Sequence, residues 1–271
     1  MPELPEVETT RRGLAPHLLG QRITAVHVHD ARLRWPVAPT LAIDLQARQI
    51  RAVERRAKYL LLRLDHGTLI LHLGMSGSLR VLPQATARLT HDHIDMQLGS
   101  GQTLRFNDPR RFGSCLYTTA EPDLHPLLRA LAPEPFDAAF DAAYLHRITR
   151  RRRVAIKTLL LNGRLVTGVG NIYASEALFR SRIRPRRQAR SLTLAECRAL
   201  VRAIRGVLGM AIKAGGTTLR DYVNVDGAPG YFRQKLFVYE RAGLACRRCR
   251  TPIRQIAQGQ RSTYYCPSCQ H

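Results

Sequence analysis

The sequence predicts an α+β protein built from several domains, and three changes of pattern along the chain carry this prediction. A short helical stretch opens the chain, short apolar runs separated by turn residues extend from about residue 22 to 118, and helical periodicity takes over after residue 140. The end of the chain, from residue 246 onward, gathers four cysteines. A length of 271 residues is enough for two domains, or for one large domain with an appendage.

The charge balance indicates a nucleic-acid partner. The chain has 43 Lys and Arg residues against 20 Asp and Glu, a formal net charge of +23 and a sequence pI near 11.1. Each cation that contacts a phosphate releases a counterion, so this excess favours an anionic polymer over a merely soluble surface. The longest apolar runs, YLLLRL and LILHLGM, are too short to span a membrane, and no secretory signal pattern opens the chain. We therefore expect no membrane partner and a cytoplasmic location.

The first predicted element is a helix over residues 2–14. Pro5 suits a first helical turn, and the carboxylates of Glu3 and Glu6 favour the positive end of the helix dipole. The basic pair and the glycine at 11–13 predict the helix end. Three apolar residues form its inward stripe: Leu4, Val7 and Leu14.

The following region has the texture of a β domain. Strand-like segments are ITAVHVHD, KYLLLRLDHGTLILHL, HDHIDMQLGSGQTLRF and GSCLYTT. The tetrapeptides DHGT (65–68) and GSGQ (99–102) suit hairpin turns between such strands. The region therefore predicts a β-sandwich or a barrel-like domain.

A helical region follows the proline-containing connection APEPFDAAF (132–140), which is the best candidate for a domain boundary. The helical segments are AAYLHRI, RVAIKTLLL, ASEALFRSRI and TLAECRALVRAIRGVLGMAIKAG. Thr193 or Ser191 could cap the last helix, which should end at the glycines 215–216. A Gly-, Asp- and Asn-rich loop comes next, before the cysteines.

The four terminal cysteines have the spacing C-x2-C-x16-C-x2-C. Two such pairs can present four thiolates to one tetrahedral zinc, and the spacer is long enough for a β-hairpin; a pair of disulfides is the alternative. Four thiolates leave no open coordination position, so we expect a structural zinc that supplies folding energy to a small tail. Two further cysteines, Cys115 and Cys197, stand alone and suggest buried reduced thiols. The predicted ligands are Cys246, Cys249, Cys266 and Cys269.

Two predicted turns carry large apolar side chains. HLGMSGSLR places Met75 between glycines, and FNDPRRFG places Arg110, Arg111 and Phe112 after a proline turn. Such side chains normally pack back on their own domain. In a strongly basic protein they could instead enter a base stack as wedges that hold a flipped nucleotide out.

Two other motifs suggest phosphate contacts. GVGNIYASEALF (168–179) places glycines and Asn171 before a helix start, where backbone N–H groups can hold a phosphate or simply form a turn. His91 and His93 would share one side of a strand, but no third metal ligand is identifiable. This pair favours a phosphate contact or a cross-strand polar pair.

The N-terminus offers a reactive amine. If Met1 is removed, Pro2 has a secondary amine whose pKa, about 8 for an α-amino group, is lowered further by the helix dipole. Such an amine can attack a sugar aldehyde carbon and form an iminium ion, which acidifies the neighbouring C2′ hydrogen. Glu3 and Glu6 can move protons beside it. The alternative is that PELPE is only a good helix start.

Taken together, the motifs resemble those of the formamidopyrimidine-DNA glycosylases. The shared motifs, in order, are MPELPEVETTRRGL, RRAKYLLL, HLGMSGSLR, HDHIDM, DPRRFG, GVGNIYASEALF, GGTTLRDYV with DGAPGYF, and the four-cysteine tail. The resemblance covers essentially the whole chain. It implies a bacterial base-excision repair enzyme, a bifunctional 8-oxoguanine DNA glycosylase and AP lyase.

The resemblance implies roles for particular residues. Pro2 is the Schiff-base nucleophile, Glu3 the general acid/base, Lys58 a proton donor near the lesion nucleotide, and Arg261 the residue of the δ-elimination step. DNA contacts are implied for His91, Arg110, Arg152 and Asn171, and a wedge for Met75, Arg110 and Phe112. Glu6 and the loop 217–231 match the damaged-base pocket. The chain departs from the family at 150–153, where arginine stands throughout and family members often have lysines.

The implied architecture has four parts. Residues 1–132 form a catalytic N-terminal helix and two-sheet antiparallel β-sandwich, 133–150 a linker, 151–236 a helix–two-turn–helix DNA-binding domain with a lesion-recognition loop, and 237–271 a zinc-finger β-hairpin. We expect one structural zinc, no organic cofactor, damaged double-stranded DNA as partner, and a monomer associated with the bacterial nucleoid.

Two alternatives remain open from the sequence. Endonuclease VIII resembles this fold and proline mechanism but prefers oxidised pyrimidines; PELPEVET and DPRRFG favour the purine enzyme. A zinc-ribbon nucleic-acid binder without catalysis would not need a free N-terminal amine.

Overall fold

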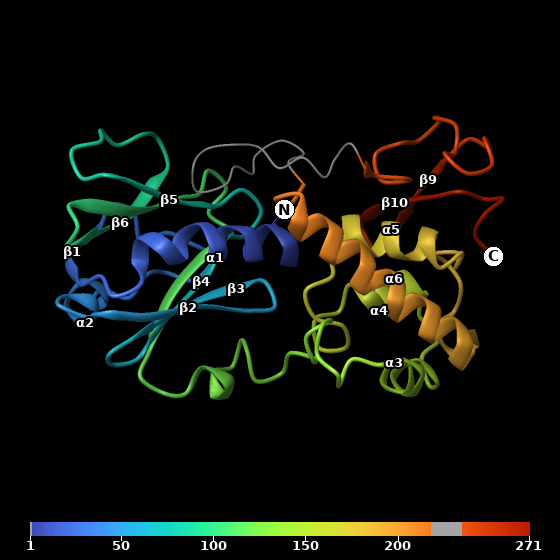
Figure 1. Ribbon diagram of the computed structural model, residues 1–271, viewed down its shortest axis with the longest axis horizontal. Coiled ribbons are helices and arrows are strands. Elements are labelled where there is room, and N and C mark those ends of the chain that lie inside the picture. Colours follow the sequence, from blue (N-terminus) through green and yellow to red (C-terminus); the bar gives the residue numbers. More distant parts are fainter. Residues whose placement is uncertain (1, 218–234) are drawn as a thin grey trace. The chain divides into compact units, whose positions relative to one another are not determined.

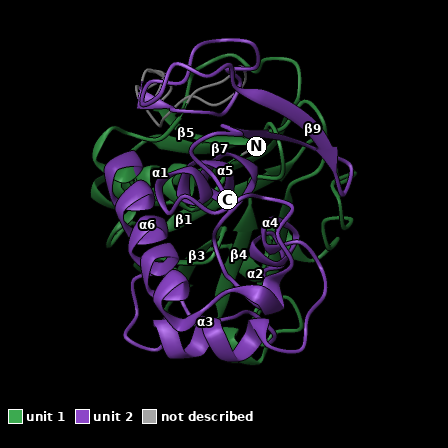
Figure 2. Cartoon of the chain, turned by 90° about the vertical axis from the view of Figure 1, so that its right-hand side faces the viewer, with its two compact units in different colours: residues 1–129, 212–233 green, residues 130–211, 234–271 purple. Residues whose placement is uncertain are grey.

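The computed structural model describes residues 2–217 and 235–271, which separate into two compact units (Figures 1 and 2). Unit 1 contains residues 1–129 and resumes at residue 212, and unit 2 contains residues 130–211 and resumes at 234. Met1, the stretch DYVNVDGAPGYF and all but the first residue of the loop 217–231 lie outside the described residues. The domain limits predicted after residues 132, 150 and 236 stay predictions.

Unit 1 contains two four-stranded antiparallel sheets. The first has the order β1 (Ile23–Val28), β6 (Asp92–Leu98), β7 (Gln102–Asn107), β5 (Ser78–Pro83). The second has the order β2 (Ile50–Arg56), β3 (Tyr59–Leu64), β4 (Thr68–His72), β8 (Ser114–Thr118). Helix α1 (Leu4–Leu18) packs against β2, β3 and β5, and in Figure 1 it runs lengthwise between the two sheets.

One apolar core joins these layers. Fully buried side chains from α1, from the first sheet and from the second sheet, such as Leu14, Ile94 and Leu62, belong to a single cluster. Strands β1 and β2 bury some of their residues and leave others in solvent, as expected of sheets that are covered on one face. The predicted two-sheet sandwich is therefore confirmed.

The predicted hairpin turns are also confirmed. Gly67 and Gly101, which lie in DHGT and GSGQ, have φ values of 77° and 76°. This left-handed conformation is open to glycine at little cost, and it allows β3 to turn into β4 and β6 into β7.

Two predictions for unit 1 were wrong. Helix α1 does not stop at 11–13 but continues to Leu18, through Gly13 and Pro16. A helical glycine costs about 1 kcal/mol and a proline about 3 kcal/mol, whereas burying Leu14 and Leu18 completely contributes about 3–6 kcal/mol. In addition, the predicted β region contains the short helix α2 (Leu41–Leu45), whose two terminal leucines lie one turn apart and are both fully buried.

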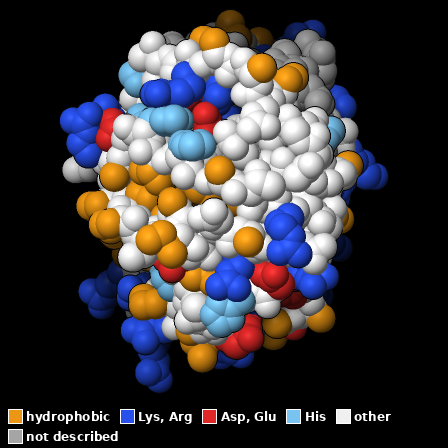
Figure 3. Space-filling view, turned by 90° about the vertical axis from the view of Figure 1, so that its left-hand side faces the viewer, with side chains coloured by type: hydrophobic (Ala, Val, Ile, Leu, Met, Phe, Trp, Pro, Cys, Tyr) orange, Lys and Arg blue, Asp and Glu red, His pale blue; other side chains and the backbone are white. Residues whose placement is uncertain are grey.

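One face of the protein has scattered basic side chains around an apolar area. Figure 3 views the side of the molecule on which α2 and β1 lie in Figure 1; apolar side chains gather there, and Lys and Arg lie scattered around them. The exposed apolar side chains of unit 1 include Leu19 and Ile43, the latter 77% exposed. This face therefore has no continuous basic surface.

Unit 2 is helical and ends in a β-hairpin. Its helices are α3 (Ala142–Thr149), α4 (Ile156–Leu160), α5 (Asn171–Arg180) and α6 (Leu194–Lys213), and its strands are β9 (Arg254–Gln258) and β10 (Arg261–Tyr265). Two 3-10 turns, η1 (Pro122–Leu124) in unit 1 and η2 (Ala189–Ser191) in unit 2, complete the described elements. All four helical segments and the hairpin between the cysteine pairs are confirmed. No helix within the described residues is long and apolar enough to cross a lipid bilayer.

The ends of α6 follow the predicted signals. Thr193 accepts a hydrogen bond from the backbone N–H of Glu196 (3.2 Å), and the Glu196 carboxylate accepts one from the Thr193 backbone N–H (2.8 Å). This reciprocal capping box starts the helix. Beyond its end, Gly215 and Gly216 have φ values of 73° and 84°, which terminate the helix.

Candidate active site

The N-terminal residues form a tight, buried helix start. Glu3 is the N-cap of α1, its side chain accepts a bond from the Glu6 backbone N–H, and Glu6 accepts one in return from the Glu3 backbone N–H (2.8 Å). Pro2 is buried, and Glu3 and Glu6 are each 1% exposed. The capping box explains why two acids can be buried here, because backbone donors and the positive helix end stabilise them.

Glu6 also connects the helix start to the segment after α6. Its second carboxylate oxygen accepts a hydrogen bond from the backbone N–H of Thr217 (2.7 Å). The adjacent Gly216, at φ 84°, lies so close that an added Cβ would come within 3.1 Å of the same carboxylate. Glu6 thus lies at the described edge of the loop 217–231.

Lys58 lies in the turn between β2 and β3, and the structure brings it near a histidine that the sequence reasoning missed. His72 ends β4; burial, together with the positive charges of Lys58 and Arg34, lowers its pKa to about 4. Its Nδ1 accepts a hydrogen bond from the Gly74 backbone N–H (2.9 Å). A neutral imidazole therefore lies between Lys58 and the turn that carries Met75. The only sequence signal was a histidine at a strand end, directly before LGMSG.

The two turns with large apolar side chains lie against each other. An added Cβ at Gly74 would meet the Phe112 carbonyl carbon at 2.4 Å, so only glycine allows the turn of Met75 to approach the segment of Phe112 so closely. Phe112 is 45% exposed, and the Arg110 guanidinium lies 5.0 Å from its ring centre. Met75 is half-buried and Arg110 is exposed.

Asp108 fixes both turns, and sequence reasoning missed it as well. Its buried carboxylate accepts hydrogen bonds from the Ser76 hydroxyl (2.8 Å), from the Gly113 backbone N–H (2.7 Å) and from the Arg110 backbone N–H (3.3 Å). Ser76 belongs to the turn of Met75, whereas Arg110 and Gly113 flank the Phe112 segment. One carboxylate therefore holds the predicted wedge residues in a fixed arrangement.

The expected pairing of His91 and His93 is met in part: their rings lie 6.3 Å apart at an angle of 47°, although His91 lies outside the strand. His91 precedes β6, with a φ of 71°, and is exposed, whereas His93 is 2% exposed and its Nε2 lies 2.8 Å from the Asp108 carbonyl oxygen. The positive φ turns the chain between them. His91 is thus available to a ligand, and His93 forms a buried polar contact.

In unit 2, Asn171 and the hairpin of Arg261 lie together. Asn171 is the first residue of α5, and its side-chain NH2 donates to the Ser262 carbonyl oxygen (3.0 Å). Lys157, which is 1% exposed, donates to the same carbonyl (3.1 Å) and to the Thr263 hydroxyl (2.7 Å). These bonds position β10, whose first residue, Arg261, is exposed. In Figure 1 this strand lies beside α5.

Arg152 has a structural contact of its own. Its guanidinium donates to the Ile148 carbonyl oxygen (3.0 Å) in the last turn of α3, and the side chain is half-buried. This bond satisfies a helix carbonyl that lacks an intrahelical partner. The DNA contact implied for this position stays a prediction.

The four terminal cysteines form one cluster. Their sulfur atoms all lie within 4.8 Å of one another, and the Cys249 and Cys266 sulfurs are 3.4 Å apart. Tetrahedral zinc with Zn–S bonds of about 2.3 Å requires sulfur separations of about 3.8 Å. Burial and the neighbouring thiols raise the pKa of Cys269 to about 12, so metal binding must displace protons from the cluster. The set fits one structural zinc.

The finger is anchored to α5 through a buried acid. Glu176, 1% exposed, accepts hydrogen bonds from the backbone N–H groups of Phe237, Val238 and Tyr239, at 2.9 to 3.0 Å. Burial raises its pKa, and the three bonds oppose that shift. The remaining cysteines, Cys115 and Cys197, are buried and free, as predicted.

The structure combines a β-sandwich, Pro2 beside Glu3 at a buried helix start, a helical unit and a four-cysteine cluster that fits zinc. This combination defines the architecture of a zinc-containing enzyme that acts on nucleic acid. Comparisons with known proteins agree. Residues 1–115 match the formamidopyrimidine-DNA glycosylase N-terminal domain, residues 131–223 the H2TH domain of the same enzymes, and residues 243–271 the zinc finger found in FPG and IleRS. The chain therefore belongs to the formamidopyrimidine-DNA glycosylase family, a family of DNA glycosylases.

Three relatives show how close the likeness is. The formamidopyrimidine-DNA glycosylase of Thioalkalivibrio sulfidiphilus is 59% identical over 270 residues, covering 100% of both chains. The crystal structure of the MutM (Fpg) protein from Thermus thermophilus is 43% identical, with a TM-score of 0.89 over 99% of this chain and 98% of the other. A mutant of Lactococcus lactis Fpg, solved in complex with a Fapy-dG containing DNA, is 33% identical, with a TM-score of 0.93 over 100% of both chains.

Proposed function

We propose that this protein excises oxidised purines, 8-oxoguanine and formamidopyrimidines, from duplex DNA and then cleaves the abasic site by β,δ-elimination. The observation that carries the proposal is the placement of Pro2 beside Glu3 at the buried start of α1, in a chain that belongs to this family. The complex of the Lactococcus lactis relative with Fapy-dG containing DNA supports an oxidised purine as the lesion.

The chemistry starts at the proline nitrogen. With Met1 removed, the lone pair of that nitrogen attacks C1′ of the damaged nucleotide, and the bond from C1′ to the base breaks with its electron pair going to the base. Lys58 supplies a proton near the lesion nucleotide. Glu3 takes the proton that the attacking nitrogen loses and delivers it to the sugar ring oxygen as the ring opens, which leaves an iminium ion between Pro2 and C1′.

Strand cleavage follows from the charge of that ion. The iminium withdraws electrons, so the C2′ hydrogen becomes acidic; its removal expels the 3′ phosphate, and a second elimination expels the 5′ phosphate. Arg261, exposed at the start of β10, assists the second step. Water then hydrolyses the remaining iminium ion, which releases the sugar fragment as an aldehyde and frees the amine of Pro2.

The other site residues bind and deform the DNA. Met75, Arg110 and Phe112 occupy the space left by the flipped nucleotide, because their turns are held together by Asp108 and present an exposed aromatic and a cation. His91, Arg152 and Asn171 contact phosphates, and Glu6 with the loop 217–231 forms the damaged-base pocket. These roles carry over from the family motifs, position by position.

The proposal extends to the state and place of action. The protein acts as a monomer on damaged double-stranded DNA in the bacterial cytoplasm, associated with the nucleoid. A net charge of +23 supports retention on nucleic acid.

A reduction trap tests the mechanism. Borohydride added during reaction with an 8-oxoguanine duplex should convert the iminium into a stable covalent adduct, and peptide mapping should place that adduct on Pro2. An intact mass measured beforehand must show that Met1 is absent. An adduct on a lysine side chain, or no adduct from processed protein, would overturn the assignment.

A further inference from the structure

Four arginines surround a hollow in unit 2 that the catalytic scheme does not use. The hollow has a volume of about 450 Å3 and is lined by Arg180, Arg182, Arg202 and Arg248, together with small residues of α6 such as Ala203 and Gly206. No atom lies within 4 Å of the position that a Cβ on Gly206 would occupy, so the hollow is open beside this glycine. The lining contains no acidic residue.

Two of the guanidinium groups are held on aromatic rings. Arg180 lies 5.3 Å from the ring centre of Phe237 and Arg248 lies 4.8 Å from that of Phe179. The two rings stack on each other at 5.4 Å. A guanidinium whose face rests on a ring keeps its N–H edges for other partners, and its fork geometry matches phosphate oxygens.

Within the described residues, Glu176 is the acid that compensates the charge of the hollow, through Arg180. Arg180 is one turn from Glu176, but both carboxylate oxygens of Glu176 accept backbone hydrogen bonds from the segment 237–239. The Arg180 Nε atom is buried and has no hydrogen-bond partner within the described residues. Arg182, Arg202 and Arg248 are exposed. An anion entering the hollow would therefore meet preplaced donors rather than existing ion pairs.

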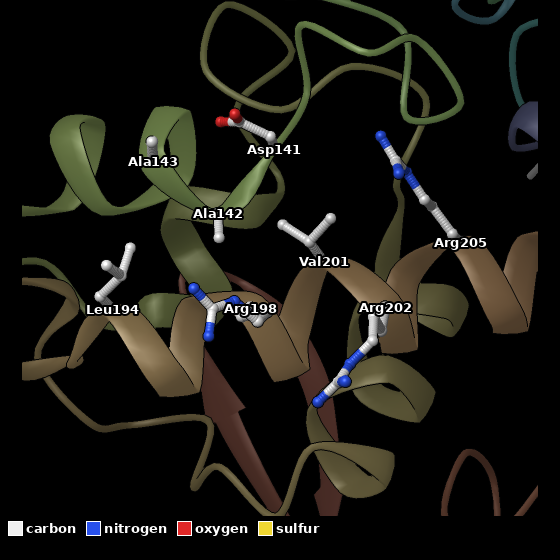
Figure 4. Close-up of a pocket in the computed structure, with 8 residues that line it drawn as sticks. All are labelled: Asp141, Ala142, Ala143, Leu194, Arg198, Val201, Arg202 and Arg205. Atoms are coloured by element: carbon white, nitrogen blue, oxygen red, sulfur yellow. The ribbon is translucent and has the colours of Figure 1, made fainter.

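A neighbouring hollow on the other side of α6 is less suited to an anion. It has a volume of about 410 Å3, and its lining includes an acid, Asp141, and the arginines Arg198, Arg202 and Arg205, so Arg202 borders both hollows. Figure 4 shows the Arg202 side chain pointing away from Val201 and Asp141. Arg205 there donates to the Pro135, Asp137 and Phe140 carbonyl oxygens, so it is already used in holding the loop before α3.

The four-arginine hollow is separate from the contacts assigned above. Asn171 is the first residue of α5 and Arg180 the last, so about 14 Å of helix separates them. We propose that this hollow is a second phosphate-binding site, which takes the backbone of a DNA segment lying outside the stretch held at Asn171. The ligand chemistry is a run of phosphodiesters, recognised without base contacts.

A matched pair of double variants tests the site. Arg182→Gln with Arg202→Gln neutralises the hollow at two exposed positions, and Arg129→Gln with Arg164→Gln removes two exposed arginines elsewhere, so both proteins have the same net charge. Affinity for a long lesion-free duplex is measured against salt. The slope of log affinity against log salt is negative, and each lost phosphate contact reduces its magnitude by about 0.9. The hollow variant loses two contacts, so the magnitude of its slope should be about 1.8 smaller than that of the control.

The same pair gives two further readouts. Single-turnover excision on a short lesion duplex should be equal to wild type in both variants; a loss there would concern the proposed catalytic function and not the hollow. Equal salt slopes in the two variants would overturn the second site. Calorimetry with inorganic tripolyphosphate distinguishes DNA from a free phosphate chain as the ligand. If the hollow variant no longer binds tripolyphosphate but its duplex affinity keeps the salt dependence of the control, the DNA assignment is overturned and the ligand is a free phosphate chain.

Discussion

His72 illustrates how one half-buried side chain can connect a proposed proton donor with the turn of the predicted wedge residue Met75. Its ring packs at 4.8 Å from that of Tyr59, and its Nδ1 accepts the Gly74 N–H at the start of the Met75 turn. A protonated ring would place a donor against that N–H and a positive charge near Lys58 and Arg34. Burial of the ring, together with the positive charges of Lys58 and Arg34, favours the neutral form that this bond requires and lowers the pKa to about 4.

This requirement predicts a pH dependence of stability. Between about 4 and the usual value of 6.5 the unfolded chain binds a proton that the folded chain excludes, so the free energy of unfolding should fall as the pH drops through this window. The full effect is about 3 kcal/mol. In His72→Asn an amide oxygen can accept the same N–H without titrating, so the fall should be smaller. Urea unfolding at a series of pH values measures it, and parallel profiles for the two proteins would contradict the prediction.

At the residue scale, the sequence indicated types of chemistry better than contacts. It could single out Pro2 and Glu3 as candidates and find the cysteine cluster, because chain position and spacing carry these predictions. It could not find His72 or Asp108, because their importance comes from neighbours distant in sequence. For Glu3 and Glu6 the two interpretations weighed from the sequence are compatible: the capping box forms, and it leaves the acids beside Pro2.

At the scale of elements, Asp108 ties the turn between β4 and β5 to the segment before β8. Asp108→Asn should disturb this link, because an amide has only one acceptor oxygen and would turn an NH2 group toward the Ser76 hydroxyl or the Gly113 N–H. An unsatisfied buried donor costs about 1–3 kcal/mol. If Met75, Arg110 and Phe112 act as the proposed wedge, excision of 8-oxoguanine should slow by about 10-fold or more, since displaced side chains would no longer hold the nucleotide out.

A ready-made abasic site provides the comparison for this variant. No base has to be flipped and released there, so strand cleavage should lose much less than excision in single-turnover assays. Ser76→Ala removes one of the three bonds and should give an intermediate loss of excision. An equal loss on both substrates would show that Asp108 does not act through the wedge.

Element boundaries show where sequence patterns stop being informative. The hairpins β3–β4, β6–β7 and β9–β10 were predictable, because glycine-containing turns and apolar runs specify them locally. The extension of α1 to Leu18 and the insertion of α2 were not, because burial in a core shared by two sheets outweighed local helix-ending signals. The same holds for His91, which has a positive φ and whose carbonyl oxygen accepts the backbone N–H of Asp108, a residue distant in sequence.

At the scale of the whole molecule, the zinc links the chain's end to the helices of unit 2. Cys246 and Cys266 are fully buried in an apolar cluster with Phe179, Val238 and Tyr264. The β10 strand of the finger is held by Lys157 of α4 and Asn171 of α5. Loss of the metal should therefore disturb the proposed DNA contacts as well as the finger itself, while the two sheets of unit 1 have a separate core.

Cys269→Ser tests this dependence. Three thiolates bind zinc more weakly than four, so metal analysis should show substoichiometric zinc, and affinity for duplex DNA should fall by a factor of at least about 10. Cys115→Ser serves as a control, because that thiol lies in the core of unit 1 and outside the cluster. The sandwich should remain folded in the Cys269 variant, with protected amide hydrogens in β3 and β6. Unchanged DNA affinity after confirmed loss of zinc would mean that the hairpin holds its place through Lys157 and Asn171 alone.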